Sequence, residues 1–179
     1  FIFDCFADEQ RSQTSFESKN GKYCLKYQRK KWVLTDKEGS IKYKLKDCGF
    51  TSMTIVVSDN GENIIVIDDF MEGHKIEKRN TLWLFKKGKL LKSYKLTELI
   101  TDTCNVSRSI WHTEWSYGNF ELTDNQNHFS FTTYELSEII VDLATGQIIS
   151  NRKPTGFDSD CLIVFGEFRK GEENYATMK

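Results

Sequence analysis

Two short stretches of the sequence hold most of the residues that could do chemistry, and the first runs from Asp68 to Glu77. Four carboxylates and one imidazole fall within it: Asp68, Asp69, Glu72, His74 and Glu77. Carboxylate oxygens suit calcium and an imidazole suits zinc, but the spacing matches neither a calcium-binding loop nor a zinc-binding helix. The plainer interpretation is a solvated loop whose aspartates cap the end of a strand. We therefore predict no metal site, and we keep Asp69 and His74 as candidate binding residues.

The second stretch is the aromatic segment from Trp111 to Tyr117, WHTEWSY. Read as a strand, it places alternate residues on opposite faces, with the row Trp111, Thr113, Trp115 and Tyr117 on one face and His112, Glu114 and Ser116 on the other. A row of rigid rings can bind a sugar, a peptide or a base. The alternative is that the rings belong to the core, where large aromatic residues mostly lie. His112 and Glu114 could form an acid–base couple, although the sequence supplies no third partner.

The familiar catalytic motifs are missing from the chain. The sequence has no GxSxG, P-loop, GxGxxG or HExxH pattern, so the common hydrolase, nucleotide-binding and metalloprotease signatures are absent and no cofactor is predicted. A basic run from Gln28 to Trp32 could contact phosphate, but it falls where a hairpin turn is expected, so we interpret it as a solvated turn. Asn105 begins an Asn-Val-Ser glycosylation pattern, which is frequent by chance.

The elements that must position these residues recur three times. Three stretches open with a polar turn that leads into an apolar run: SKNGKYCLKY, SDNGENIIVI and TDNQNHFSFT. Each is followed by a second run, a turn ending in glycine and a third run, which is typical of a repetitive antiparallel β protein. We predict an all-β fold of four-stranded, propeller-like meander repeats over about residues 12–45, 51–96 and 109–151, with a final strand near 161–168. The whole of 1–179 is predicted to be a single β-repeat domain.

The turns carry their own predictions. Asn20-Gly21 and Asn60-Gly61 suit a tight two-residue hairpin in which both turn residues take positive φ. Asn125-Gln126 stands at the equivalent place in the third repeat and is predicted to turn through a longer or type I loop. The second turns end in Gly39, Gly88 and Gly146, as a type I turn followed by a left-handed residue requires.

Several predicted strands are apolar at consecutive rather than alternate positions: residues 54–57, 64–67, 139–141 and 162–165. Both faces of such strands must be buried, which predicts sheets stacked face to face. The runs 41–45 and 91–96 alternate with lysine and are predicted to be guarded sheet edges. Between the second and third strands, repeat two has an insertion, Phe70 to Asn80, of the kind that forms a loop on one face of a repeat protein. Residues 97–102 are predicted to form one helical turn capped by Thr97.

Composition restricts the partners and the location of the chain. With 25 basic and 26 acidic residues the net charge is -1, so no overall field attracts nucleic acid, and no apolar run is long enough to span a membrane. Five cysteines lie at 5, 24, 48, 104 and 161, too far apart for a CxxC site. Cys24, Cys48, Cys104 and Cys161 either form two disulfides or stay buried thiols. The cysteine usage and the apolar start of the chain predict an exported protein.

Three segments carry a resemblance to a known group: SDNGENIIVIDDF, LWLFKKGKLLKSYKLTEL and EIIVDLATGQII. They resemble the repeats of uncharacterised bacterial secreted proteins of the β-propeller (TolB-like) type. The matching residues are turn and core positions, so the resemblance implies a fold rather than an activity. Since closed propellers have at least four blades, three units imply an open stack, or a ring closed by a mixed sheet.

These patterns favour a non-catalytic binding module of the cell envelope, in the periplasm or on the cell surface, whose ligand is a protein, a peptide or a glycan. The candidate binding residues are Asp69, His74, Trp111, His112, Trp115 and Tyr117. The competing hypothesis is a hydrolase acting on a glycan or peptide, with His112 and Glu114, or His74, as acid and base. A third hypothesis is a homo-oligomer in which a second copy completes the stack of sheets.

Overall fold

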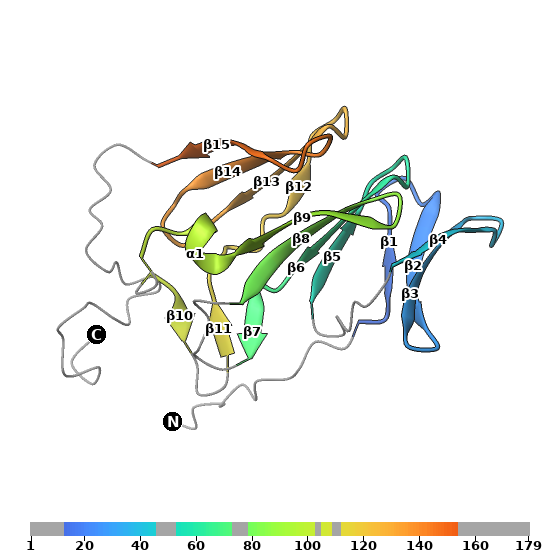
Figure 1. The fold of residues 1–179 in the computed structure, drawn as a ribbon, viewed down its shortest axis with the longest axis horizontal. Coiled ribbons are helices and arrows are strands. Elements are labelled where there is room, and N and C mark those ends of the chain that lie inside the picture. The colour runs from blue at the N-terminus through green and yellow to red at the C-terminus, as the bar shows by residue number, and fades with distance from the viewer. Residues whose placement is uncertain (1–12, 46–52, 73–78, 103–104, 109–111, 154–179) are drawn as a thin grey trace, which may run out of the picture.

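The computed structural model describes residues 13–45, 53–72, 79–102, 105–108 and 112–153. The regular secondary structure of these residues is β-strand, apart from one helical turn, α1 (Leu96–Leu99) (Figure 1). The strands are β1 (Ser15–Glu17), β2 (Tyr23–Gln28), β3 (Lys31–Asp36), β4 (Ile41–Leu45), β5 (Thr54–Val57), β6 (Asn63–Ile67), β7 (Phe70–Glu72), β8 (Asn80–Lys86), β9 (Lys89–Lys95), β10 (Ser107–Arg108), β11 (His112–Glu114), β12 (Glu121–Leu122), β13 (His128–Thr132), β14 (Glu138–Asp142) and β15 (Ile148–Arg152).

Three four-stranded antiparallel sheets follow one another along the chain. The first sheet has the order β1-β2-β3-β4, the second β5-β6-β8-β9 and the third β12-β13-β14-β15. Each is a meander, so the predicted all-β architecture of recurring four-stranded units is confirmed. A small sheet of order β10-β11-β7 lies beside them. The predicted strand near 161–168 lies outside the described residues.

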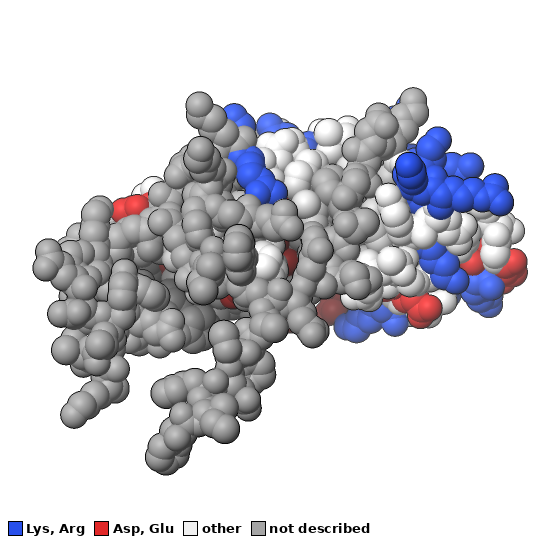
Figure 2. All heavy atoms as spheres, turned by 90° about the horizontal axis from the view of Figure 1, so that it is seen from below, with Lys and Arg blue, Asp and Glu red and all other residues white. Residues whose placement is uncertain are grey.

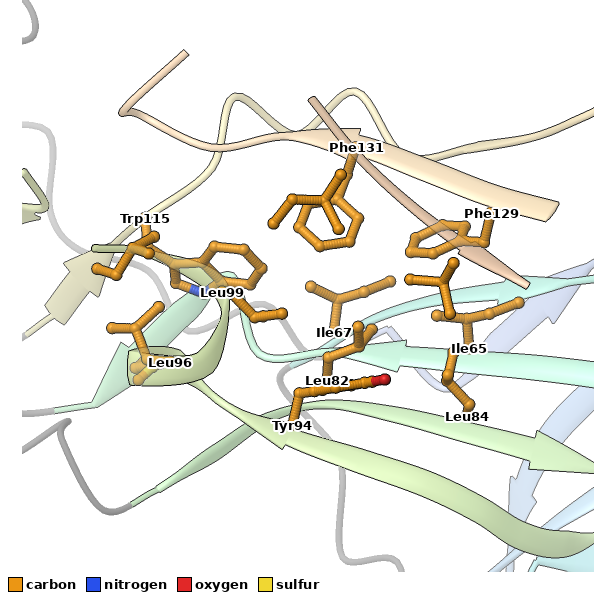
Figure 3. Packing of buried hydrophobic residues seen from close by; sticks show 14 of the residues in the cluster. Ile65, Ile67, Leu82, Leu84, Tyr94, Leu96, Leu99, Trp115, Phe129 and Phe131 are labelled. Atoms are coloured by element: carbon orange, nitrogen blue, oxygen red, sulfur yellow. The ribbon is translucent and has the colours of Figure 1, made fainter. Parts of the chain in front are cut away.

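The second sheet is covered on both of its faces. One face shares a core with the first sheet; that core contains Leu25, Trp32, Leu34, Leu45, Ile55, Val57, Ile64, Val66 and Phe85. The other face shares a core with the third sheet and α1, where Ile65, Ile67, Leu82 and Leu84 meet Phe129, Phe131, Ile139 and Val141 (Figure 3). All five residues of β6 are buried. The burial of both faces of β6, predicted from its consecutive apolar residues, is therefore confirmed, because alternate side chains enter two different cores.

The first turn of each repeat is built in the same way. In the first sheet, Ser18 Oγ donates to Asn20 Oδ1 at 2.9 Å and accepts from the amide of Tyr23 at 3.1 Å. Ser58 with Asn60, and Thr123 with Asn125, repeat these bonds in the other two sheets. A hydroxyl and a side-chain amide thus fix all three turns in one conformation.

This shared turn corrects the prediction made for the two Asn-Gly pairs. Only the fourth residue of each turn has positive φ: Gly21 at 68°, Gly61 at 69° and Gln126 at 59°. The Asn-Gly pairs are therefore not two-residue hairpins, because the asparagine side chain is used to close a longer loop. Gln126 adopts the same left-handed conformation as the two glycines, and its amide donates to Thr123 O as those of the glycines do to Ser18 and Ser58. The longer loop predicted for Asn125-Gln126 is therefore present, and the first two turns share it.

Two-residue turns with positive φ at both positions occur elsewhere. Arg29 and Lys30 have φ values of 48° and 64° between β2 and β3, and Lys87 and Gly88 have 48° and 78° between β8 and β9. The hairpins predicted around Gly39, Gly88 and Gly146 all form. The turn at Gly88 is nevertheless of the two-residue kind, whereas a longer type was predicted.

The first turns of neighbouring sheets are hydrogen-bonded to each other. The amide of Asn20 donates to Asp59 Oδ1 at 2.8 Å, and Asn20 Nδ2 donates to Asp59 O at 3.0 Å. The amide of Asp59 in turn donates to Gln126 Oε1 at 2.8 Å. These bonds join the first turns of the three sheets to one another, so that the three turns lie at the same end of the stack.

The remaining local predictions are partly corrected. The helical turn predicted near residue 97 is present, but it begins one residue earlier and Glu98 accepts a bond from the amide of Lys95 at 2.8 Å, so Thr97 is not the cap. The lysine-containing strands β4 and β9 are sheet edges, as predicted.

Candidate functional site

The small sheet joins the two stretches that the sequence singles out. β7 forms the start of the insertion in repeat two, and it pairs antiparallel with β11 from the aromatic segment, with Phe70 opposite Glu114 and Met71 opposite Thr113. The start of the insertion is therefore a strand rather than a loop. Residues about forty positions apart in the chain become neighbours in one sheet.

The two faces of this small sheet differ in character. Met71 and Thr113 are fully buried, and Met71 joins the core beside the third sheet. Because side chains alternate along a strand, Phe70, His112 and Glu114 lie on the opposite face. The ring of His112 stacks on that of Phe70, with centroids 4.1 Å apart and planes at 23°.

The aromatic row does not continue along one face. β11 ends at Glu114, and the chain then changes partner and forms a single bridge between Ser116 and Thr133. Trp115 turns into the core, where it is fully buried and meets Phe131 edge-on at 5.6 Å. Trp115 is therefore a core residue, which is the second of the two interpretations of the aromatic segment.

Trp115 also ties the insertion to the core. Its Nε1 donates to Asp68 O at 2.7 Å, and Thr81 Oγ1 donates to the same oxygen at 2.7 Å. The carboxylate of Asp68 lies 3.4 Å from Arg79. Asp68 thus secures the end of β6, which is the structural role that the sequence allows for it.

Tyr117, by contrast, stays at the surface. Its side chain is 42% exposed and meets the ring of Tyr134 edge-on, with centroids 4.9 Å apart. The hydroxyl of Tyr134 donates to Glu114 Oε2 at 2.9 Å. Tyr134 thereby links Tyr117 to the outward face of β11.

The electrostatics of this group come from closely spaced acidic groups. The pKa of Tyr134 is raised, first of all by burial. The hydrogen bond and the charge of Glu114 raise it further, and so do the charges of Tyr117 and Asp69. The phenol therefore stays protonated and remains a hydrogen-bond donor. Asp69, itself buried, belongs to the same electrostatic neighbourhood.

We define the aromatic–acidic face as Asp69, Phe70, His112, Glu114, Tyr117 and Tyr134. Phe70 and Tyr134 could not be identified as site residues from the sequence, because only the long-range pairing of β7 with β11 and the bridge at Thr133 bring them there. Of the candidate residues, the structure brings together Asp69, His112 and Tyr117, while Trp115 supports them from the core. His74 and Trp111 lie outside the described residues.

Other sites raised by the sequence have simpler explanations in the structure. Within the described ranges, no three His, Cys, Asp or Glu residues are grouped to hold a metal. Cys24 is a free thiol whose Sγ lies 3.3 Å from Ser15 Oγ, while the other four cysteines lie outside the described residues. Asn105 is buried, and its Nδ2 donates to Glu135 at 3.2 Å.

A search for helices that could cross a bilayer, over the part of the chain that the structure describes, finds none that is long and apolar enough.

No protein-family description matches the sequence, and no curated protein matches it. Among solved structures, the chain is similar to the β-propeller domain of Cps50 (Swd1) from Myceliophteria thermophila, at 14% identity over 80% of this chain and 43% of that one, with a TM-score of 0.41. The WD40 β-propeller domain of Doa1 gives 15% identity, 75% and 37% coverage and a TM-score of 0.37. BamB from Moraxella catarrhalis is 12% identical over 78% of this chain and 48% of that one, with a TM-score of 0.34. The chain spans less than half the length of each of these structures.

Proposed function

We propose that this chain is a non-catalytic binding module that recognises a protein or peptide through the aromatic–acidic face. The observation that carries the proposal is the pairing of β7 with β11, which places Phe70, His112 and Glu114 on one face, with Phe70 and Glu114 partly exposed and His112 buried beneath Phe70. Tyr117 adds an exposed ring at the border of that face. Aromatic rings beside a polar rim are the usual composition of a binding surface.

The chemistry of the face favours contact over catalysis. Glu114 is held by the hydroxyl of Tyr134, and His112 is stacked against Phe70. Both contacts fix side chains in place, and pre-organised aromatic groups bind with little loss of conformational entropy. Nothing in this geometry favours a hydrolase, so we do not advance the acid–base hypothesis further.

The test is selection of peptides from a display library on the unmodified chain, followed by affinity measurements on variants. We expect Tyr117→Ala and Glu114→Gln each to weaken the selected peptides at least about tenfold, as truncation of a hot-spot residue does. Leu136→Ala is the matched control, because Leu136 is exposed to a similar extent at 44% but is not part of the face. Peptides that bind all four proteins equally would contradict the proposal.

The same experiment on a glycan array separates ligand classes. Binding of a glycan that is lost in Tyr117→Ala would keep the face as the site and replace the peptide by a sugar, because tyrosine rings also stack on sugar faces. The cell-envelope location is part of the proposal and rests on the resemblance of the repeats to bacterial secreted proteins. Its test is fractionation of the source cells with an antibody against the chain.

A further inference from the structure

Charge is unevenly distributed along the stack, although the whole chain is close to neutral. Residues 13–45, which contain the first sheet, have nine Lys and Arg against three Asp and Glu. Residues 53–102, around the second sheet, have eight of each, and residues 112–153, which contain the third sheet, have two against six. The stack thus has a basic end, and Figure 2 shows the Lys and Arg side chains gathered at the end where the first sheet lies.

Strand register assigns several of these cations to one face. The inward-facing residues of β2, β3 and β4 belong to the core shared with the second sheet: Leu25, Trp32, Leu34 and Leu45. Since side chains alternate along each strand, Lys26, Lys31 and Lys44 project from the opposite, outer face. Lys26 lies opposite Val33, and Val33 lies opposite Lys44, so the two lysines flank one apolar residue across three strands.

The turn between β2 and β3 extends this basic row. Arg29 and Lys30 form that turn, and Lys31 follows it directly. All five cations are exposed, and within the described ranges none of them is within ion-pair distance of a carboxylate. Glu17 of β1 is the acidic residue on the same face.

Other cations of the first sheet are neutralised locally. Lys42 Nζ lies 2.6 Å from Asp36 Oδ2, and Lys37 Nζ lies 3.7 Å from Glu38 Oε1. Lys19 and Lys22 are also exposed and have no ion pair within the described ranges, but they belong to the turn between β1 and β2, at the other end of the sheet. The basic face, defined as Lys26, Arg29, Lys30, Lys31 and Lys44, is therefore the largest group of uncompensated cations in the first sheet. An array of uncompensated cations attracts a surface of fixed negative charge.

The shape and chemistry of the basic face favour one kind of anionic surface. Tyr27 and Trp32 of β2 and β3 point into the core, so this face offers no rings on which the bases of a single strand could stack. A second copy of the chain is the competing partner, because its third sheet is acidic, although Asp142 in that sheet is already bonded by Thr145. A bilayer is flat, carries dense negative charge and requires no base readout.

We propose that the basic face docks the chain peripherally on the surface of an anionic phospholipid bilayer. The attraction is electrostatic, and each lysine or arginine near an anionic bilayer strengthens binding about fivefold. The exposed lysine heads meet the headgroup phosphates, while the first sheet stays folded on its core. The aromatic–acidic face belongs to a different sheet and stays available to its own ligand.

The test is co-sedimentation of the chain with vesicles of phosphatidylcholine alone and of phosphatidylcholine with roughly one third phosphatidylglycerol, an anionic lipid. The variant Lys26→Gln, Lys31→Gln, Lys44→Gln removes three uncompensated cations. The matched control, Lys37→Gln, Lys87→Gln, Lys89→Gln, removes the same charge elsewhere, where Lys37 and Lys87 pair with Glu38 and Glu62. Circular dichroism and thermal melting establish that both variants are folded.

We expect the unmodified chain to bind anionic vesicles and not neutral ones, the first variant to lose about a hundredfold in affinity and the control to change less than about fivefold. Equal losses in both variants, or equal binding to neutral vesicles, would overturn the proposal. Tighter binding to poly(U) RNA at equal phosphate concentration would overturn it in favour of nucleic acid. Self-association that is lost in the first variant would overturn it in favour of a second copy.

A measurement on the unmodified chain decides the case if the first variant does not fold. Vesicle binding should weaken steadily as the ionic strength rises from about 0.05 to 0.5 M, because salt screens exposed charges. Binding that is insensitive to salt would refute docking through the basic face.

Discussion

Gly61, in the first turn of the second sheet, lies against Tyr23 of the first sheet. Its φ of 69° favours glycine, and a Cβ atom at this position would lie 2.7 Å from Cδ1 and Cε1 of Tyr23 in the first sheet. Gly21 has nearly the same φ, 68°, with nothing within 4 Å of its Cβ position. Substitution of these two glycines therefore separates the cost of positive φ from the cost of the collision with Tyr23.

We expect Gly61→Ala to lower the free energy of unfolding by about 2–4 kcal/mol, from left-handed strain and the collision with Tyr23 together. Gly21→Ala is the control, and should cost about 1 kcal/mol because it has the strain alone. Urea denaturation of both variants measures the difference. Equal losses would mean that the first two sheets do not meet at Gly61.

Glu135 is a buried carboxylate that holds the chain after α1. Its oxygens accept bonds from the amides of Thr101 at 2.8 Å and Asp102 at 2.7 Å, and from Asn105 Nδ2 at 3.2 Å, with the ammonium of Lys153 at 3.4 Å. Burial alone would raise the pKa of Glu135, but these donors and the positive charge outweigh it, so the pKa is lowered. The ionised form therefore stabilises the folded chain.

The lowered pKa of Glu135 predicts a dependence of stability on pH. A carboxyl whose pKa is lower in the folded than in the unfolded state stabilises the fold above its unfolded pKa, and this contribution is lost as the pH falls through the folded pKa. We expect Glu135→Gln to cost about 2–3 kcal/mol at pH 7, and less below about pH 4. Glu138→Gln, at an exposed position three residues away, is the control for both effects. A loss that is independent of pH would contradict a charged role for Glu135.

At the scale of elements, the turn between β2 and β3 is strained by its own residues. Lys30 has a φ of 64°, a conformation that costs a residue with a Cβ about 1–2 kcal/mol relative to glycine. We expect Lys30→Gly to raise the free energy of unfolding by about 1 kcal/mol, measured by urea denaturation. In the Asp36–Gly39 turn, Lys37 has no positive φ, so Lys37→Gly should be neutral or destabilising. Stabilisation by both changes would show that turn conformation is not the cause.

The strands were predictable from sequence, and so were the two buried faces of β6, whereas β5 and β14, for which two buried faces were also predicted, alternate in burial. Residues Ile64 to Ile67 are apolar without alternation, and that pattern has few explanations besides two covered faces. The conformations of the turns were harder to predict. Gln126 adopts a backbone conformation typical of glycine because Thr123 and Asn125 hold the loop and Asp59 binds its side chain, and these contacts depend on the fold.

The candidate site was predictable only as two separate segments. Composition marks the insertion and the aromatic segment, but their pairing is a long-range contact that leaves no local pattern. The same holds for Tyr134, whose link to Glu114 spans twenty residues. Trp115 was ambiguous for another reason, since a buried ring and a binding ring look alike in a sequence.

At the scale of the whole molecule, the fold distributes its charge by sheet. The net charge of -1 conceals a basic first sheet and an acidic third sheet, so the total charge does not describe the charge of either end of the stack. Proteins with separated charges orient in an external field and at a charged surface. The stacked sheets give this separation a fixed direction, from the basic face toward the third sheet.

The most direct test of the stacked architecture is the stability of two single substitutions in β6. Ile64 faces the first sheet and Ile65 faces the third, and both are fully buried. Urea denaturation should show that Ile64→Ala and Ile65→Ala each cost about 2–5 kcal/mol, whereas Ile149→Ala, at a position 57% exposed, costs less than about 0.5 kcal/mol. If either β6 substitution proved as harmless as Ile149→Ala, one face of the second sheet would be open to solvent and the three sheets would not form a stack.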